Sequence, residues 1–335
     1  MASLYKNMVC SIRIGKVLFD VVNAVSIKQS IMLLSDTATL TLPREFKKAI
    51  VNGKAESTER KNIRDFIAEG DEVEIKLGYN DDLYTRFKGY LKKISADVPL
   101  VLECEDEMWQ LRKGKLNKTF KKVSLKELIE FIAPGYETEI IDDINLGKYI
   151  VKNASPYEVL EALRNSHLMH SYFRDKTLVV GFPSDFKPQI SHMVNLSSDG
   201  DKVHCNVRSS KNLKFVRKDE MKLEIRAIST NSNGSKETVT VGESGGTTRT
   251  LNFANTPKSE LEKIAKKNLE SLHFDGYSGS IDLFGEPIVN AGESLDISDP
   301  AYTESERQGK YLIEAVDIDF KAAEYNQAVK LSLPL

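Results

Sequence analysis

The sequence has few cysteines and no long apolar run. Its 335 residues include three scattered cysteines, Cys10, Cys104 and Cys205, an odd number that fits neither a disulfide framework nor a zinc cluster. No stretch approaches the run of about 20 apolar residues that a transmembrane helix needs. The N-terminal segment alternates polar and apolar residues and so does not resemble a secretory signal. These absences favour synthesis in a reducing compartment, the cytoplasm, and no membrane partner.

A large excess of either charge is also lacking. Lysine and arginine number 47 and the acids 49, for a formal net charge of −2. Bulk electrostatics therefore favours neither a nucleic acid nor an anionic membrane as partner. Hydrophobic residues make up 41% and charged residues 29%, as in a soluble globular protein with a core. The length predicts two or three domains.

The histidines and cysteines do not form a catalytic or metal-binding pattern. His167 and His170 stand three apart without a third ligand nearby, so we interpret them as packed or partly exposed side chains. His204 and Cys205 are adjacent. In a strand they would point to opposite faces and could not form a nucleophile–base pair.

Three further segments contain chemical side chains but no complete motif. The acids Glu103, Glu105, Asp106 and Glu107 precede Trp109, and we interpret them as a solvated strand end. GESGG, residues 242–246, lacks the Lys and Ser/Thr of a phosphate loop and predicts a turn. The basic run 112–122 is interpreted as a solvated face. We therefore predict no catalytic residues, no cofactor, no metal and no enzymatic activity.

Alternating patterns dominate both ends of the chain. Residues 8–43 predict several antiparallel strands, and 72–105 predict more. The charged segment 44–68 is expected to be a loop with some helix between them. The sequence thus predicts a mainly β, α+β protein with two small antiparallel β-barrels, residues 1–105 and 201–335.

Residues 106–200 have a different pattern and predict an intervening α+β domain. Two helices are expected, one capped by Ser124 and ended by Pro134, the other capped by Ser155 with Pro156 in its first turn. A strand pair from His170 to Phe182 follows. In the second barrel, residues 230–255 predict a long polar hairpin or exposed loop, and 257–272 predict an amphipathic helix capped by Thr256.

One pattern occurs twice. Residues 70–95 and 292–317 each begin with Gly and an acid, continue with alternating apolar residues, and return through Gly and Tyr. The distance from the first Gly to the last apolar position is the same in both, which predicts a structural duplication. The repeated positions are Gly70, Asp71, Val73, Ile75, Gly89, Tyr90 and Ile94, and then Gly292, Glu293, Leu295, Ile297, Gly309, Tyr311 and Val316.

The C-terminal part resembles the phage late control protein D and tail baseplate hub family. The family's Gly-x-Pro-x-x-x-x-Gly-[Asp/Glu] pattern matches Gly285, Pro287, Gly292 and Glu293, and its later segments match Gly309, Tyr311, Val316, Phe320, Gln327, Val329 and Leu331. Ile318 departs, because the family has His or Asp there. The first half and the segment 156–181 are similar in a more general way, whereas 44–68 and 230–255 match no part of the pattern.

The resemblance implies a structural hub of a contractile tail. It implies a homotrimeric ring whose paired tube-type barrels give pseudo-six-fold symmetry, which joins a hexameric tail tube to a trimeric spike and encloses a channel for DNA or an effector. The implied partners are other copies of the chain, the tube protein, a spike on a separate polypeptide and other baseplate proteins. The implied location is a phage virion tail or an injection-system baseplate, assembled in the bacterial cytoplasm.

Two other interpretations stay open at this point. One is an enzyme or carbohydrate-binding module on β-barrels that acts on the cell envelope. The other is a monomeric tail-assembly adaptor. The sequence does not distinguish phage from injection system or a contractile from a flexible tail, nor does it give the channel-lining residues, the identity of spike and tube, or the stability of the trimer without the spike.

Overall fold

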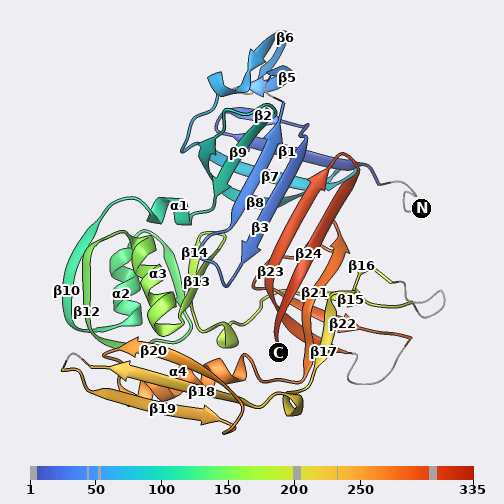
Figure 1. The fold of residues 1–335 in the computed structure, drawn as a ribbon. Coiled ribbons are helices and arrows are strands. Elements are labelled where there is room, and N and C mark those ends of the chain that lie inside the picture. The colour runs from blue at the N-terminus through green and yellow to red at the C-terminus, as the bar shows by residue number, and fades with distance from the viewer. Residues whose placement is uncertain (1–5, 44, 52–53, 199–204, 232, 302–307) are drawn as a thin grey trace.

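Two β-barrels and a third lobe make up the molecule (Figure 1). The computed structural model describes residues 6–43, 45–51, 54–198, 205–231, 233–301 and 308–335. The first barrel lies at the top of the figure, the second at the right, and the third lobe at the left and below. The fold is mainly β with several antiparallel sheets, as the alternating patterns predict.

The first barrel is built from the N-terminal strands in the order β3-β4-β9-β8-β7-β1-β2. Its inward-facing side chains include Ile12, Val25, Leu40, Ile75 and Leu102, all buried. Alternation along each strand places these residues on one face. The strands are β1 (Met8–Ile14), β2 (Val17–Phe19), β3 (Ala24–Ser30), β4 (Thr37–Leu42), β7 (Glu72–Tyr79), β8 (Asp82–Ile94) and β9 (Leu100–Glu105).

The charged insertion of the first barrel is a β-hairpin and not the loop with some helix that its composition predicts. Strands β5 (Glu45–Val51) and β6 (Lys54–Asn62) pair with each other, and β5 also pairs with β2. Only a short 3₁₀ turn, η1 (Ile63–Asp65), follows. The hairpin extends the barrel sheet at its upper end (Figure 1). Backbone pairing with β2 holds this segment in strand form, although its polar sequence does not predict a strand.

The second barrel combines strands from two distant parts of the chain. Strands β21, β23 and β24 form its longest ladder, β22 pairs with β23, and β15 pairs with β22. The strands are β15 (Ser191–Asn195), β16 (Val207–Ser209), β17 (Leu213–Val216), β21 (Gly276–Phe284), β22 (Ser294–Ser298), β23 (Gly309–Lys321) and β24 (Glu324–Pro334). Its core side chains join those of the first barrel in one cluster.

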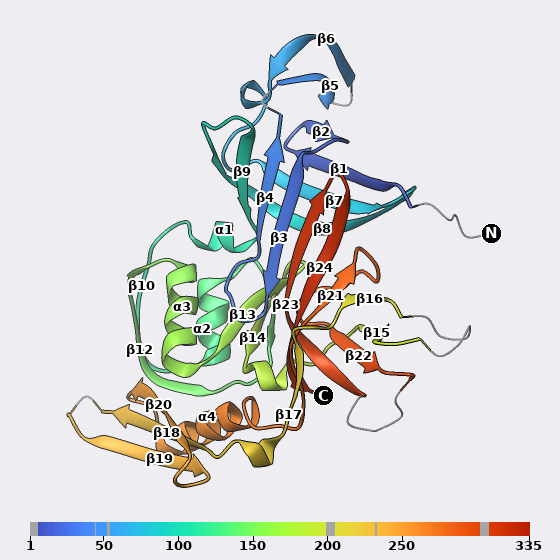
Figure 2. The same ribbon diagram turned by 45° about the vertical axis from the view of Figure 1, so that its right-hand side comes forward.

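One ladder makes the two barrels a continuous sheet. Strand β23 pairs antiparallel with β3, from Ala315 opposite Ser30 to Lys321 opposite Ala24. Ile318, the position that departs from the family pattern, is buried opposite Ile27 in this ladder. Figure 2 shows the β23–β24 hairpin rising alongside β3 and β4.

The third lobe has its own core. Its elements from the middle of the chain are α1 (Met108–Leu111), β10 (Leu116–Ser124), α2 (Leu125–Ile132), β11 (Glu137–Ile140), β12 (Asn145–Ala154), α3 (Pro156–His167), β13 (His170–Arg174), β14 (Thr177–Gly181) and the 3₁₀ turn η2 (Pro183–Asp185). Ser124 and Ser155 cap α2 and α3, each with a reciprocal capping box. The predicted helix starts and the β13–β14 hairpin are therefore confirmed.

Residues 223–270 pack in the third lobe, which differs from the division that places them in the second barrel. They form β18 (Leu223–Thr230), β19 (Lys236–Gly242), β20 (Thr247–Ala254) and α4 (Lys258–Glu270), after the 3₁₀ turn η3 (Lys218–Glu220). Strands occupy the segment predicted as a polar hairpin or loop, and GESGG forms the turn between β19 and β20. Helix α4 starts after Pro257, one residue beyond the predicted cap.

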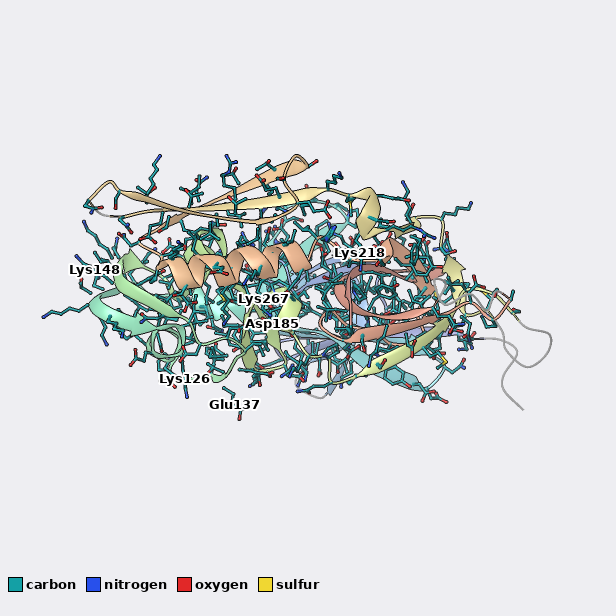
Figure 3. All side chains as sticks on the ribbon, turned by 90° about the horizontal axis from the view of Figure 1, so that it is seen from below. Lys126, Glu137, Lys148, Asp185, Lys218 and Lys267 are labelled. Carbon is teal, nitrogen blue, oxygen red and sulfur yellow. The ribbon has the colours of Figure 1, made fainter. Side chains whose placement is uncertain are left out.

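The apolar face of α4 explains where this segment packs. Leu261, Ile264 and Ala265 share the core cluster of α2 and α3, because the amphipathic pattern specifies a buried face but not its partner. Figure 3, from below, shows α4 between the β18–β20 sheet and the rest of the lobe, with Lys267 beside Asp185. None of the helices in the described residues is long and apolar enough to cross a membrane.

Candidate functional site

The start of β7 in the first barrel is fixed by a small hydrogen-bonded loop. Gly70 has φ +93°, the left-handed region that favours glycine. Its N–H donates to Leu91 O at 2.7 Å, and Leu91 N–H donates to Asp71 O at 2.8 Å. The Asp71 carboxylate accepts from the N–H of Ala68 at 2.8 Å. The Gly-acid pair therefore turns the chain into the strand and holds the loop before it.

The start of β22 in the second barrel makes the same bonds. Gly292 has φ +85° and donates to Ile313 O at 2.9 Å, while Ile313 N–H donates to Glu293 O at 2.9 Å. The Glu293 carboxylate accepts from Asn290 N–H, three residues earlier, at 2.8 Å. Every bond of the first loop thus has a counterpart at the equivalent spacing.

The strand register also corresponds, but it does not align all the repeated residues. Val73 lies opposite Gly89, and Leu295 lies opposite Tyr311. The counterpart of Gly89 is therefore Tyr311, and Gly309 corresponds to Phe87 instead, as the partner of Ile297. The Gly-Tyr part of the sequence repeat is out of register by about two positions. Ile94 and Val316 do correspond, since each follows the same irregularity in its ladder.

The misaligned residues have separate local reasons. A Cβ on Gly89 would stand 2.3 Å from Glu105 O, so the glycine permits close approach of β9. The Tyr90 hydroxyl faces the Glu107 carboxylate at 3.4 Å. The Tyr311 hydroxyl accepts the N–H of Tyr277 at 2.9 Å and lies close to Gly309.

Glu293 makes more contacts than its counterpart Asp71. One carboxylate oxygen lies 2.7 Å from His192 Nε2, and the other accepts from Asn290 Nδ2 at 3.1 Å. Partial burial raises the pKa of Glu293, but the hydrogen bonds from His192 and Asn290 outweigh it and hold this pKa below its usual range. This pair ties β15 to the start of β22.

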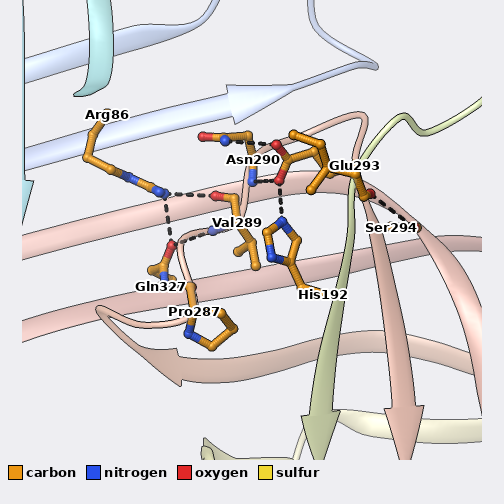
Figure 4. A network of polar contacts seen from close by, with 9 residues as sticks. Arg86, His192, Pro287, Val289, Asn290, Glu293, Ser294 and Gln327 are labelled. Carbon is orange, nitrogen blue, oxygen red and sulfur yellow. Dashed lines mark hydrogen bonds and ion pairs between the residues drawn. The ribbon is translucent and has the colours of Figure 1, made fainter. Parts of the chain in front are cut away.

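A buried arginine joins the first barrel to the second (Figure 4). Arg86 of β8 is 1% exposed. Its Nη2 donates to Val289 O and to Gln327 Oε1, both at 2.8 Å. Gln327 donates in turn to Phe284 O and Pro287 O, each at 2.8 Å. The loop that contains the family's Gly-x-Pro pattern is thereby held by one glutamine side chain.

Arg86 is not paired with a carboxylate in the described part of the chain. Its Nε and Nη1 atoms are buried and have no partner there. Burial lowers the pKa of Arg86 from its ordinary value. A second amide, Gln29 of β3, donates to the Arg86 carbonyl at 3.2 Å, so the arginine side chain and backbone connect three strands at the junction.

The acidic cluster is not the solvated strand end that we predicted. Glu105 and Asp106 are buried, and only Glu103 is exposed. Glu105 forms ion pairs with Lys92 at 2.9 Å and with Arg112 at 2.7 Å. The prediction was wrong because the strand end is covered by the third lobe, which a local pattern does not reveal.

Asp106, which is buried, and Asp36, which is partly buried, form a carboxyl pair beside this cluster. Asp106 accepts the N–H groups of Asp36 and Met108, each at 3.1 Å, and Asp36 accepts that of Ser30 at 2.9 Å. Burial raises the pKa of Asp36 to about 7, and burial together with the neighbouring Asp36 raises that of Asp106 well above its ordinary value. The pair fastens the β3–β4 connection to the third lobe.

A cavity of about 580 Å³ lies where the two barrels and the third lobe meet. Its lining combines neutral residues with nine charged ones, which are Asp36, Arg86, Lys88, Asp106, Glu107, Arg174, Asp175, Lys176 and Glu293. Four of them, Asp36, Arg86, Asp106 and Glu293, make the contacts described above. Their arrangement fixes the three parts of the molecule relative to one another and does not present a nucleophile next to a base.

The remaining predicted candidates are structural. His167 contacts Ser166 Oγ at 2.7 Å, and burial lowers the pKa of both His167 and His170 to about 4. His204 lies outside the described residues. Among those that are described, no group of three or more His, Cys, Asp or Glu side chains is placed to hold a metal ion. Residues of the basic run form β10, paired with β12.

This architecture is the fold of phage-type tail proteins. A tail protein from Neisseria meningitidis superposes with a TM-score of 0.66 at 14% identity, over 98% of this chain and 97% of the other. A 43 kDa tail protein of a Shewanella oneidensis prophage gives 0.58 at 15% identity, over 96% and 97%. An E. coli component of the type VI secretion system, itself similar to phage T4 tail proteins, gives 0.58 at 8% identity, over 100% and 76%.

Sequence comparison alone does not reach these proteins. No protein-family model matches the chain, and no curated protein matches it either.

Sequence reasoning missed Arg86 and the Asp36–Asp106 pair. Arg86 stands in the polar-looking stretch YTRFKG, and nothing local marks it as buried. One signal was present: Gln327 alternates with Val329 and Leu331 on a buried face. A polar residue on such a face needs a buried partner, and that partner is Arg86.

Proposed function

We propose that this protein is a structural hub of a phage tail or of a contractile injection system, a homotrimeric ring between a hexameric tail tube and a central trimeric spike. The observation that carries the proposal is the pair of barrels with corresponding strand-start loops and ladders, joined in one sheet. The similarity to tail proteins over nearly the whole chain supports it.

Two corresponding barrels in each chain allow a three-fold ring to match both a six-fold tail tube and a three-fold spike. Three copies arranged around a three-fold axis present six similar barrels. Such a ring can contact six tube subunits on one face and a three-fold spike on the other, since closed symmetry repeats each surface in turn. The third lobe occurs once in each chain, so the ring as a whole has three-fold symmetry even though its barrels number six.

The role is non-enzymatic. The buried polar groups at the junction bind parts of the chain to one another, as Arg86 does with Gln327 and Val289. The partners in this proposal are other copies of the chain, the tail tube protein and the spike, and the assembled ring encloses a channel for the transported DNA or effector.

The mass of the purified chain in solution tests the proposal. Light scattering coupled to size-exclusion chromatography, over a range of concentrations and with the neighbouring tail proteins co-expressed, is expected to give about three times the 37.6 kDa of one chain. A single-chain mass under every one of these conditions would contradict the trimeric ring.

A further inference from the structure

Inside one chain, the ladder between the two barrels joins an edge strand of the second barrel to an edge strand of the first. The second barrel supplies the C-terminal half of β23, and the first supplies β3. Asp317 lies opposite Lys28, with both side chains exposed and of opposite charge. Cross-strand pairs of this kind stabilise an antiparallel ladder.

The first barrel has a strand edge that corresponds to the β23 edge. Ile94 lies opposite Leu102, as Val316 lies opposite Val329, and each ladder has its irregularity just before these pairs. Lys93–Ser95 therefore corresponds to Ala315–Asp317. Among the described strands, β8 beyond Leu91 pairs only with β9, so the other edge of this last part of β8 is open.

The second barrel has a strand edge that corresponds to the β3 edge. Strand β21 occupies the place of β4, because Ile281 faces Val329 as Leu40 faces Leu102. Strand β17 then occupies the place of β3, with Leu213 opposite Gly279 where Ile27 is opposite Ala38. Within the described part of the chain, β17 pairs with β21 alone.

These two open edges lie far apart in the shared sheet. Strand β17 is an end strand on β21, whereas β8 is separated from β21 by β24, β23, β3, β4 and β9 and is followed by β7, β1 and β2. In Figure 2 the β9 side of the first barrel faces left and the β16 side of the second faces right. One edge of a copy is thus available to the other edge of the next, which is the head-to-tail arrangement that closes a ring.

We infer that neighbouring copies of this chain join by antiparallel pairing of Lys93–Ser95 of one copy with Lys214–Val216 of the next. The register follows the ladder inside the chain, so that Ser95 lies opposite Lys214 as Asp317 lies opposite Lys28. Lys214 stands at the position that Lys28 has in the ladder inside the chain. Asp97, two residues beyond Ser95, is exposed and supplies a carboxylate near Lys214 of the neighbouring copy. This inference rests on the ring proposed above and names the strands that close it.

The junction between chains is shorter than the junction within a chain. Strand β8 ends at Ile94, and Ser95 N–H already donates to Val101 O in the turn to β9. Strand β23 continues to Lys321. The exposed turn carries Val98, 72% exposed, which gives the short edge an apolar side chain to bury against the neighbour.

Engineered cysteine pairs test the register directly in the full chain. In a Cys205→Ser background, which removes the exposed thiol and leaves Cys10 and Cys104 buried, Ser95→Cys with Lys214→Cys is oxidised and run on a non-reducing gel. Directly opposite strand positions satisfy disulfide geometry. Lys28→Cys with Asp317→Cys is the positive control within one chain, and Lys88→Cys with Lys214→Cys is the off-register control.

The expected result is covalent dimers and trimers from Ser95→Cys with Lys214→Cys at least 5-fold above the off-register pair, with the Lys28–Asp317 pair remaining a single chain on the gel. A trimeric mass without this excess of cross-links overturns the strand pairing and leaves the ring proposal intact. A single-chain mass under every condition overturns both.

Discussion

The two barrels share the start of one hairpin, β7–β8 in the first and β22–β23 in the second, but differ in the strand beside it. Gly70 and Gly292 start the strand with matching bonds, and both ladders are irregular at the same place, between Leu91 and Lys93 and between Ile313 and Ala315. Their preceding strands differ, because β1 is antiparallel to β7 whereas β15 is parallel to β22. The shared geometry lies at the loop and bulge, and the differences lie at the edges.

The two barrels also differ in the polar contacts that join them within one chain. Leu100 in the first barrel faces Leu42, and at the corresponding place in the second barrel Gln327 faces Leu283. A leucine fills the first core, whereas the glutamine binds Arg86 of the other barrel. The second barrel therefore contributes the glutamine of the polar junction, and the first has an apolar residue at the same position.

The largest effect is expected when the second barrel is made to match the first at this position. Gln327→Leu removes one of the two acceptors of the buried Arg86 side chain, and it also leaves the carbonyls of Phe284 and Pro287 without the bonds from Gln327. We expect a loss of about 3–5 kcal/mol in the free energy of unfolding, measured by urea denaturation. The double variant with Arg86→Leu should recover part of it, and equal losses in the single and double variants would contradict the coupling.

Alanine at the two strand-start glycines is the next comparison. Both have positive φ, but a Cβ on Gly292 would stand 2.9 Å from the Tyr172 hydroxyl, whereas one on Gly70 meets nothing within 4 Å. Gly70→Ala is expected to cost about 1–2 kcal/mol for backbone strain, and Gly292→Ala about 2–4 kcal/mol, since overpacking adds to it. Thermal or urea unfolding of both variants measures this, and equal costs would contradict the role of Tyr172.

The carboxyl pair gives a pH dependence that only the first barrel should show. Because the folded pKa of Asp36 is about 7, above the unfolded value, its stabilising protonated form is complete below about pH 4 and is lost as pH rises through 7. Relative to Asp36→Asn, the wild-type unfolding free energy should fall by about 2 kcal/mol between pH 5 and 8. The exposed Asp317→Asn is the control. Parallel curves for wild type and Asp36→Asn would show that the pair does not titrate in this range.

The smallest difference concerns the two acids after the glycines. Glu293→Gln weakens contacts with His192 and Asn290, whereas Asp71→Asn affects the bond from Ala68. We expect losses of about 1 and 0.5 kcal/mol. The lowered pKa of Glu293 means that its contribution is present above the unfolded pKa and is lost as pH falls below about 4. Unfolding curves at pH 7 and pH 3 check this, and a Glu293→Gln effect that is unchanged at pH 3 would contradict it.

Much of the fold was predictable because the deciding signals are local. Val73 and Ile75, or Leu295 and Ile297, alternate along their strands, and Ser124 and Ser155 mark the helix starts by capping. The lobe assignment of 223–270 was not predictable, since an amphipathic face does not name its partner. The polar junction was hidden for the same reason: Arg86 and Gln327 meet only when two distant hairpins fold together.

In the ring that we propose, the two corresponding barrels of three chains form a circle of six. Electron cryomicroscopy of the purified assembly tests it most directly. The expected result is a closed particle of three chains with six similar barrel densities, in which ladders within and between chains alternate around the channel. A particle in which the first and second barrels occupy different radii, or a three-chain assembly joined through the third lobes alone, would contradict it.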